Sequence, residues 1–428
     1  MIEKDKVQMR KRNMKLFPIY RMLGWDYIFF YTTNFLFLTQ VKGIHPADVV
    51  LIDSFYALFG IIMQVPATFI IEYLGRKRSM ILANFCNCIY MLVVMFSTNL
   101  FNLITAELLS SLAFGIKETV DPALLNESIP PSRYKSKIFA KISQKGMANY
   151  YIMNAIATVL AGFFYDINPY IPITLSLIIT ILVTMISTRF IEPQNEKKKH
   201  KVQEFNQLKE IKDSFKFILK SERLKALILF SAISGGVISL MSTYEVSLLE
   251  DFDISAKYLC MIFAILGIIS GILAKKQEAF HEKYRNKSLC TLFGMIGGTI
   301  LIAGLCGIIA KQYSVLIIGI IITYMIRYSC QGMYYPLTER YLRNFSNEKI
   351  DTKIFTAKNF LKSILSAVIG IMGSFLLDRM NISYCMFIVG FLTILVTILM
   401  SQYMKTRVGL KPEEYAKEEL QFDELENR

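Results

Sequence analysis

The sequence is poor in the residues that build metal centres and disulfide frames. Its 428 residues include three histidines, His45, His200 and His281, which lie far apart in the chain. Its seven cysteines fall within or beside apolar segments, and no two of them form a C-x-x-C pair. Cysteines in that setting are typical of small buried side chains rather than of a disulfide frame or a metal site. We therefore expect no metal site, no haem and no other cofactor.

Two further absences narrow the classes of function. The sequence contains no G-x-x-x-x-G-K-[ST] segment, and so it lacks the phosphate-binding loop of an ATP-driven pump. It also contains no His/Asp acyl-transfer cluster and no long polar region that could form a large extramembrane domain. A membrane-embedded enzyme or a receptor is therefore only a distant alternative.

Apolar residues are what the sequence has in excess. They make up 54% of the chain, with a mean hydropathy of +0.41, whereas soluble domains contain about 45–50%. Each apolar run is long enough to cross a bilayer of about 30 Å as a helix. The predicted spans are residues 16–41, 47–74, 79–98, 102–126, 138–165, 169–191, 224–249, 255–275, 288–310, 314–338, 354–377 and 383–404. The sequence thus predicts an all-α, multi-pass membrane protein.

Positive charge is concentrated in alternate loops. The chain has 48 Lys and Arg against 34 Asp and Glu, a formal net charge of +14. The basic residues cluster before the first span, in the turn at 75–78, in the segment 192–223 and after residue 404. Basic loops face the cytoplasm in most membrane proteins, beside anionic lipid. We expect both termini in the cytoplasm of a cell whose Ile-, Lys- and Asn-rich usage is typical of AT-rich bacteria, and no nucleic-acid partner.

The two halves of the chain share short stretches of sequence. Residues 136–139 (S-K-I-F) recur as residues 352–355 (T-K-I-F), and residues 180–184 (T-I-L-V-T) recur unchanged as residues 393–397. Several matches in order at nearly half the chain length indicate an internal repeat of six spans. Parallel repeats of this kind place a substrate site between two bundles, near the bilayer midplane.

The repeat predicts four regions. They are an N-terminal six-helix bundle at 1–191, a cytoplasmic linker at 192–223, a C-terminal six-helix bundle at 224–404 and a cytoplasmic tail at 405–428. Within the linker, apolar residues recur at helical spacing among charges: Phe205, Leu208, Ile211, Phe215 and Ile218. That pattern predicts an amphipathic helix on the inner membrane surface.

The turn between the second and third spans carries a motif, T-F-I-I-E-Y-L-G-R-K. It resembles the signature G-x-x-x-D-R-x-G-R-K, which lies between spans 2 and 3 of the major facilitator superfamily. The motif positions are occupied here by Thr68, Glu72, Tyr73, Gly75, Arg76 and Lys77. Threonine thus replaces the first glycine, and tyrosine replaces the first arginine. Together with twelve spans and the repeat, the resemblance covers the whole chain.

The resemblance implies twelve transmembrane helices in two pseudo-symmetric six-helix bundles that work by alternating access. It also implies a cytoplasmic latch built from the motif. In this latch Arg76 would face Glu127 at the end of span 4. Glu72 would face the start of span 11, near Lys353 or Lys358. The alternative is that the cluster only sets the topology.

Two departures from the family pattern bear on the substrate. Glu107 stands in span 4 where relatives often carry an arginine linked to proton coupling. The fifth span also lacks the G-P-x-x-G-G signature of drug/proton antiporters. A drug-exporter assignment therefore loses its best support from the sequence.

Ionisable side chains inside the predicted spans are the candidate functional residues, because a charge at bilayer depth is costly without a partner or a wet cavity. In the family, spans 1, 4, 7 and 10 line the central cavity. The candidates for coupling or substrate binding on these spans are Asp26, Lys117, Glu118, Asp121, Glu245 and Arg327. The expected cavity-lining residues are Thr33, Tyr324, Tyr328 and Gln331.

These charges allow two interpretations. In the functional one, Asp26 or Glu118 exchanges protons while Lys117 and Arg327 meet an anionic or polar substrate. In the structural one, Lys117 pairs with Asp121, four residues later on the same helix. Asp26 would then neutralise a basic neighbour such as Arg21.

The sequence therefore predicts a secondary active transporter of a small molecule and not an enzyme. A proton is the expected coupling ion, because buried carboxylates are present. The first hypothesis is an antiporter that exports an amphipathic compound. The second is a symporter that takes up a polar or anionic nutrient. A monomer surrounded by membrane lipid is expected in either case.

Overall fold

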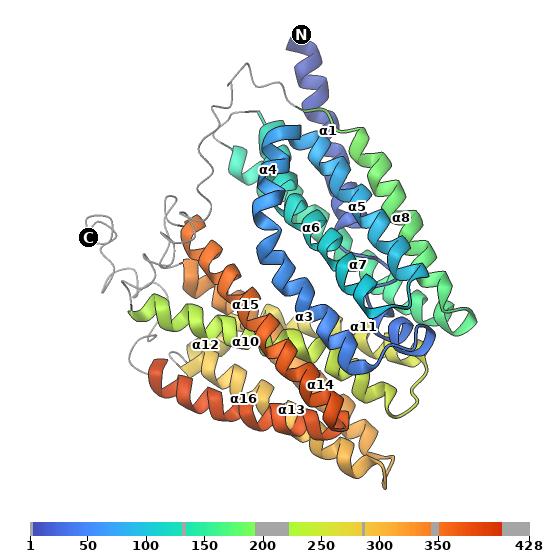
Figure 1. Cartoon of the computed structure of the whole chain (residues 1–428). Coiled ribbons are helices and arrows are strands. Elements are labelled where there is room, and N and C mark those ends of the chain that lie inside the picture. Colours follow the sequence, from blue (N-terminus) through green and yellow to red (C-terminus); the bar gives the residue numbers. More distant parts are fainter. Residues whose placement is uncertain (1–2, 131–133, 193–221, 285–286, 344–350, 405–428) are drawn as a thin grey trace. The chain divides into compact units, whose positions relative to one another are not determined.

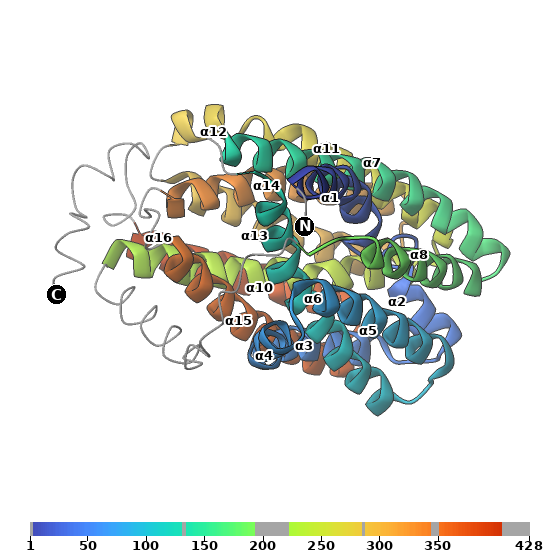
Figure 2. The same cartoon turned by 90° about the horizontal axis from the view of Figure 1, so that it is seen from above.

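The computed structural model describes residues 3–130, 134–192, 222–284, 287–343 and 351–404. Across these ranges the regular structure is helical, with no strand (Figures 1 and 2). Ten of the described helices are long and apolar enough to cross a membrane, and a bent helix pair raises the number to 11. The predicted amphipathic helix of the linker lies outside the described residues.

The chain divides into two compact units. The first is Met1–Phe205 with Ile254–Ala264, and the second is Asn206–Asp253 with Ile265–Arg428. The first unit holds α1 (Glu3–Gly24), α2 (Asn34–Leu36), the π-helix η1 (Phe37–Val41), α3 (Pro46–Ile62), α4 (Gln64–Leu74), α5 (Arg76–Phe96), α6 (Leu100–Ser128), α7 (Lys135–Ile167) and α8 (Tyr170–Thr188). The second holds α10 (Glu222–Glu250), α12 (Gln277–Tyr284), α13 (Ser288–Ala310), α14 (Leu316–Arg343), α15 (Asp351–Arg379) and α16 (Ile382–Met404). Helix α11 (Ala256–Ala274) is divided between the two.

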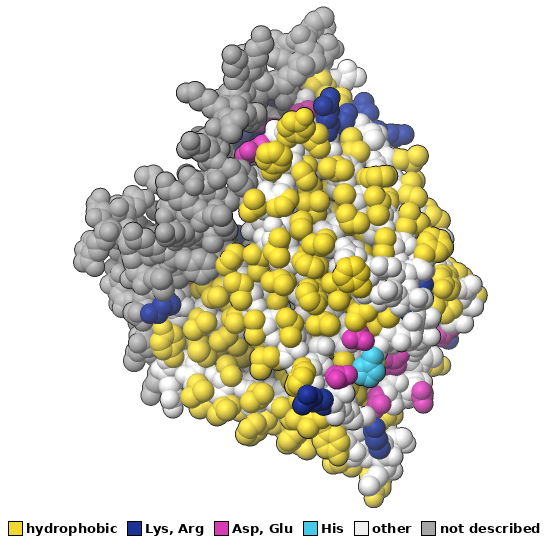
Figure 3. All heavy atoms as spheres, in the orientation of Figure 1, with side chains coloured by type: hydrophobic (Ala, Val, Ile, Leu, Met, Phe, Trp, Pro, Cys, Tyr) yellow, Lys and Arg dark blue, Asp and Glu magenta, His cyan; other side chains and the backbone are white. Residues whose placement is uncertain are grey.

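The described surface suits a lipid environment. On the face shown in Figure 3, hydrophobic side chains form a broad continuous area, and charged side chains gather toward its margins. Phe69 and Ile152, for example, are 65% and 63% exposed. A contiguous apolar surface of this kind is unfavourable in water, so lipid is its expected surrounding.

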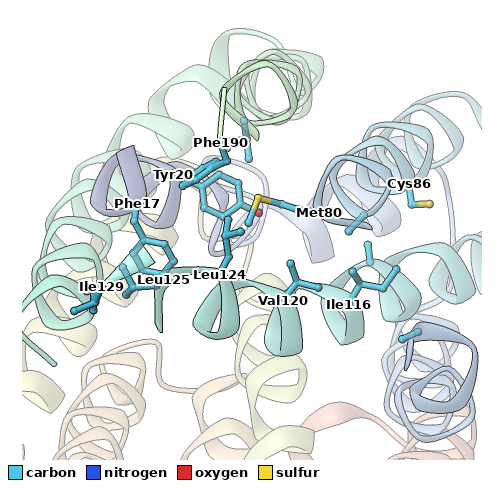
Figure 4. Close-up of a cluster of buried hydrophobic side chains, with 14 residues drawn as sticks. Phe17, Tyr20, Met80, Cys86, Ile116, Val120, Leu124, Leu125, Ile129 and Phe190 are labelled. Carbon is cyan, nitrogen blue, oxygen red and sulfur yellow. The ribbon is translucent and has the colours of Figure 1, made fainter. Parts of the chain in front are cut away.

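The core of the first unit packs around α6 (Figure 4). Ile116, Val120 and Leu124, at helical spacing on α6, are fully buried. Tyr20 of α1 meets Phe190 edge to face, with ring centroids 5.4 Å apart. These contacts hold α1 against α6 and the segment that follows α8.

The predicted continuous span at 16–41 is wrong. Helix α1 ends at Gly24, and residues 25–33 form irregular turns before α2 and the π-helix η1. Phe29 has φ +73 within this break, a left-handed conformation that is rare for a bulky residue. Strained backbone and π-helical turns occur often at functional sites. The second predicted span is also interrupted, because α3 and α4 meet at a 50° bend.

The repeated T-I-L-V-T segment has the same local structure in both units. It lies in α8 in the first unit and in α16 in the second. The hydroxyls of Thr180 and Thr393 each donate to the carbonyl four residues earlier, at 2.8 and 2.7 Å. In the second unit α16 packs closely on α13, because a Cβ on Gly390 would lie 2.3 Å from the backbone of Leu301. Small residues permit such close approach between membrane helices.

Gly75 separates α4 from α5 with φ +79 and ψ 167, a conformation that is essentially restricted to glycine. We expect Gly75→Ala to destabilise the protein by about 1–3 kcal/mol. The measurement is the melting temperature of the purified protein in detergent. The matched control is Gly60→Ala, since Gly60 lies in a helix and a Cβ there would meet nothing within 4 Å. Equal melting temperatures for the two variants would contradict the strain at Gly75.

Candidate functional site

Asp26 lies in the break of the first span and is held by neutral donors. Its Oδ1 accepts from the backbone N–H of Tyr27 at 2.7 Å, and its Oδ2 accepts from the hydroxyl of Tyr150 on α7 at 3.3 Å. Among the described residues, no ion pair involves Asp26. Arg21, the basic neighbour named in the structural alternative, pairs with Asp121 instead.

Lys117 of α6 reaches the end of α1. Its ammonium donates to the carbonyl of Gly24, although Lys117 itself is only 5% exposed. Gly24 also permits close packing of α8 at this point, because a Cβ there would lie 2.8 Å from Val183. Since the last carbonyls of a helix carry partial negative charge, a cation is favourable at this place.

Asp121 binds Arg21 rather than the lysine one turn earlier. Arg21 Nη1 lies 3.6 Å from Asp121 Oδ2, and the hydroxyl of Tyr20 donates to Asp121 Oδ1 at 3.3 Å. The predicted ion pair between Lys117 and Asp121 is not formed. The pairing instead joins α1 to α6, and it stabilises the buried Asp121 carboxylate, which is 1% exposed.

A small pocket lies against the break, with room for about one water molecule. It is lined by Leu23, Gly24, Asp26, Tyr27, Asn84, Asn87, Phe114, Lys117, Thr180 and Val183. Two of the candidates from the sequence, Asp26 and Lys117, thus line the same pocket. Asp121 lies behind it, linked through Tyr20, whose hydroxyl accepts from Asn84 Nδ2 at 3.2 Å.

The sequence analysis missed the polar side chains of α5 in this region. The hydroxyl of Tyr27 donates to Asn87 Oδ1 at 2.9 Å and lies 3.0 Å from the hydroxyl of Ser110. Tyr90 stacks on Tyr27 and donates to Glu107 Oε1 at 2.9 Å. Asn84 and Asn87, three residues apart in an apolar helix, were the signal that could have revealed this polar face. Glu107 was noted only as a departure from the family pattern.

In the second unit, Glu245 of α10 and Arg327 of α14 form a buried ion pair. Both side chains are nearly inaccessible, at 0% and 3%. Two guanidinium nitrogens contact two carboxylate oxygens, in a bidentate arrangement. Arg327 Nη1 also donates to Gln331 Oε1 at 2.8 Å, and the guanidinium lies 4.4 Å from the ring centre of Tyr328. The sequence named both charges as candidates but did not pair them.

The remaining candidates take different places. Tyr324 is buried, and its hydroxyl donates to the backbone carbonyl of Glu245 at 3.3 Å. Thr33 is buried, and its hydroxyl donates to the carbonyls of Phe29 and Phe30. It therefore stabilises the backbone of the break. Glu118 is exposed and points away from the core of its unit.

The expected ion pair between Arg76 and Glu127 is present at the start of α5, with both side chains partly exposed. Glu192, just past α8, accepts from the backbone N–H of Arg76 at 2.9 Å, and so it caps this helix. The sequence did not predict the role of Glu192. Glu72 is exposed, and its expected contact with span 11 joins two units and stays a prediction.

With this geometry in place, comparison with known proteins identifies the family. The model of the Major Facilitator Superfamily matches residues 16–343. The chain belongs to this superfamily. A relative from Bacillus subtilis (strain 168), an uncharacterized MFS-type transporter named YxaM, is 22% identical over 247 residues. That match covers 57% of this chain and 60% of the relative.

Solved superfamily structures share the fold at low identity. A mutant form of the nucleoside transporter NupG aligns with a TM-score of 0.69 at 12% identity, over 93% of this chain and 99% of NupG. A D-xylose-proton symporter aligns with a TM-score of 0.64 at 12% identity, over 94% and 99%. These likenesses establish the superfamily fold for this chain. The superfamily match and the long apolar helices together support a multi-pass membrane protein.

The buried pair of the second unit gives a prediction about stability. We expect Arg327→Met to destabilise the protein by about 3–5 kcal/mol, because Glu245 would remain buried without a cation. The double variant Glu245→Leu/Arg327→Met removes both charges and should recover most of that loss. Melting temperatures in detergent test this. A double variant no more stable than Arg327→Met would show that the unpaired Glu245 carboxylate is not the cause of the lost stability.

The superfamily motif gives a second prediction. Because Arg76 and Glu127 are partly exposed, we expect Arg76→Glu to change stability by no more than about 1 kcal/mol. If the pair is half of a latch, the same variant should lose most transport, and Arg76→Glu/Glu127→Arg should regain part of it. Arg78→Glu, at a neighbouring exposed position, is the matched control. Equal transport by Arg76→Glu and Arg78→Glu would indicate that the basic cluster at 75–78 only sets the topology.

Proposed function

We propose that the protein is a proton-coupled secondary transporter that exports a small amphipathic molecule by alternating access. The observation that carries the proposal is Asp26. It is a carboxylate in a broken membrane helix, beside a pocket, bound only by neutral donors among the described contacts. A carboxylate that is outside any salt bridge can gain and lose a proton without breaking an ion pair. That property suits a group that exchanges protons in each transport cycle.

The partners of Arg327 and Lys117 help to distinguish export from uptake. Uptake of an anionic nutrient was favoured by these two cations. Arg327 is now bound bidentately by Glu245, and the ammonium of Lys117 is bound by the Gly24 carbonyl. Neither cation is therefore offered to an anion in this conformation, which supports export as the first hypothesis.

The solved neighbours give general support to the proposal that a proton is the coupling ion. One solved neighbour is a D-xylose-proton symporter, so the fold accommodates proton coupling. Others are nucleoside and peptide transporters, and these names do not single out one substrate class for this chain. In the proposal the protein acts as a monomer in the cell membrane, with both termini in the cytoplasm. Glu72 and Arg76 hold the closed latch.

Asp26→Asn tests the coupling. A screen of amphipathic compounds, comparing export with accumulation, first identifies a transported compound. In proteoliposomes we then expect an imposed proton gradient to drive that compound through the wild type and not through Asp26→Asn, because the amide cannot carry the proton.

Asp378→Asn is the matched control, since Asp378 is exposed on α15. It should transport like the wild type. Wild-type transport at the same rate with and without the proton gradient would contradict the proposed proton coupling. Gradient-driven transport by Asp26→Asn would remove Asp26 from that role.

A further inference from the structure

The pocket at the break in the first span offers hydrogen-bond acceptors. Its lining residues include Gly24 at the end of α1, Asp26 and Asn84, which carry a carbonyl, a carboxylate and an amide oxygen as possible acceptors. The aromatic residues Tyr27 and Phe114 also line the pocket. Acceptors combined with aromatic faces are the surroundings that a cation with N–H donors prefers.

Asn84 supplies an acceptor that the protein leaves unused. The residue is 0% exposed, and its Nδ2 donates to the Met80 carbonyl at 3.0 Å and to the Tyr20 hydroxyl at 3.2 Å. These two bonds fix the orientation of the amide, so that Oδ1 is the free acceptor. Asn84 Oδ1 is buried without a hydrogen-bond partner. Because buried polar atoms are nearly always paired, this atom is an acceptor for a donor that occupies the pocket.

Lys117 shows which donor the pocket accepts. Its ammonium is bound to the Gly24 carbonyl and lies 5.2 Å from the ring centre of Phe114. Lys117 is therefore a primary ammonium already held at this wall of the pocket, supplied by the chain itself. Asp26, near the same wall, has no ion pair among the described contacts.

We propose that this pocket binds the protonated primary amine of the transported molecule, and that Lys117 is the tethered competitor of that amine. When a substrate amine enters, it takes the acceptors Gly24 O, Asp26 and Asn84 Oδ1, and Lys117 withdraws. When the substrate leaves, Lys117 returns and closes the end of α1. This inference rests on the proposed transport function and gives its substrate class, an amphipathic primary amine.

The chain contains a reporter at the site. Trp25 is its single tryptophan, and it lies between Gly24 and Asp26. The Trp25 ring meets the ring of Tyr150 edge to face at 6.3 Å, and Tyr150 donates to Asp26. Intrinsic fluorescence of the purified protein in detergent therefore reports on this pocket without a label and without a proton gradient.

The experiment titrates methylammonium while Trp25 fluorescence is recorded. We expect Lys117→Met and Lys117→Ala to bind methylammonium with a Kd lower than that of the wild type by about tenfold or more. Adding Asn84→Ala or Asp26→Asn to Lys117→Met should remove that gain. Tetramethylammonium, which has no N–H donor, should produce no such gain. Two truncations are used so that misfolding of one still leaves a test.

Lys145→Met is the matched control, because Lys145 is an exposed lysine on α7. It should bind methylammonium like the wild type. Equal affinities in the wild type and the Lys117 variants would overturn the proposal, as would an equal response to tetramethylammonium. These outcomes leave the proposed function intact if Asp26→Asn still abolishes gradient-driven transport. Loss of that effect with methylammonium binding retained would instead leave an amine site without proton coupling.

Discussion

In a bilayer, every backbone N–H and C=O group must find a partner inside the protein, and this constraint explains most of the first unit. A helix that stops at Gly24 leaves its last carbonyls without intrahelical partners at a buried position. Two side chains supply donors to these carbonyls. Lys117 donates to the Gly24 carbonyl, and Thr33 donates to carbonyls in the break. The break is therefore satisfied partly from within, by Thr33, and partly by Lys117 of α6, which also lines the pocket.

The buried carboxylates of this protein have two kinds of partner. Asp121 and Glu245 each bind an arginine, and such pairs fix two helices together because separating them leaves a buried charge. Asp26 and Glu107 bind tyrosine hydroxyls, and the described contacts give neither of them an ion pair. The paired carboxylates suit a structural role, whereas a carboxylate with neutral partners can change its protonation. This division favours Asp26 over Asp121 as the coupling group.

The sequence predicted the fold because hydropathy, loop charge and the half-chain repeat are properties of the chain itself. It could also place Arg76 against Glu127, since the family motif carries that geometry. It could not predict the break, because W-D-Y-I-F-F-Y-T-T contains neither proline nor glycine and continues an apolar run. Nor could it pair Glu245 with Arg327, because that pairing depends on the relative rotation of α10 and α14.

The central claim is that Asp26 gains and loses a proton inside the folded protein. Infrared difference spectroscopy measures it directly, by following the carbonyl stretch of protonated carboxylic acids as the pH is changed. The account predicts that the wild-type spectra contain a titrating carboxyl band that is missing from Asp26→Asn and retained in Asp378→Asn. Superimposable difference spectra for the wild type and Asp26→Asn would contradict it.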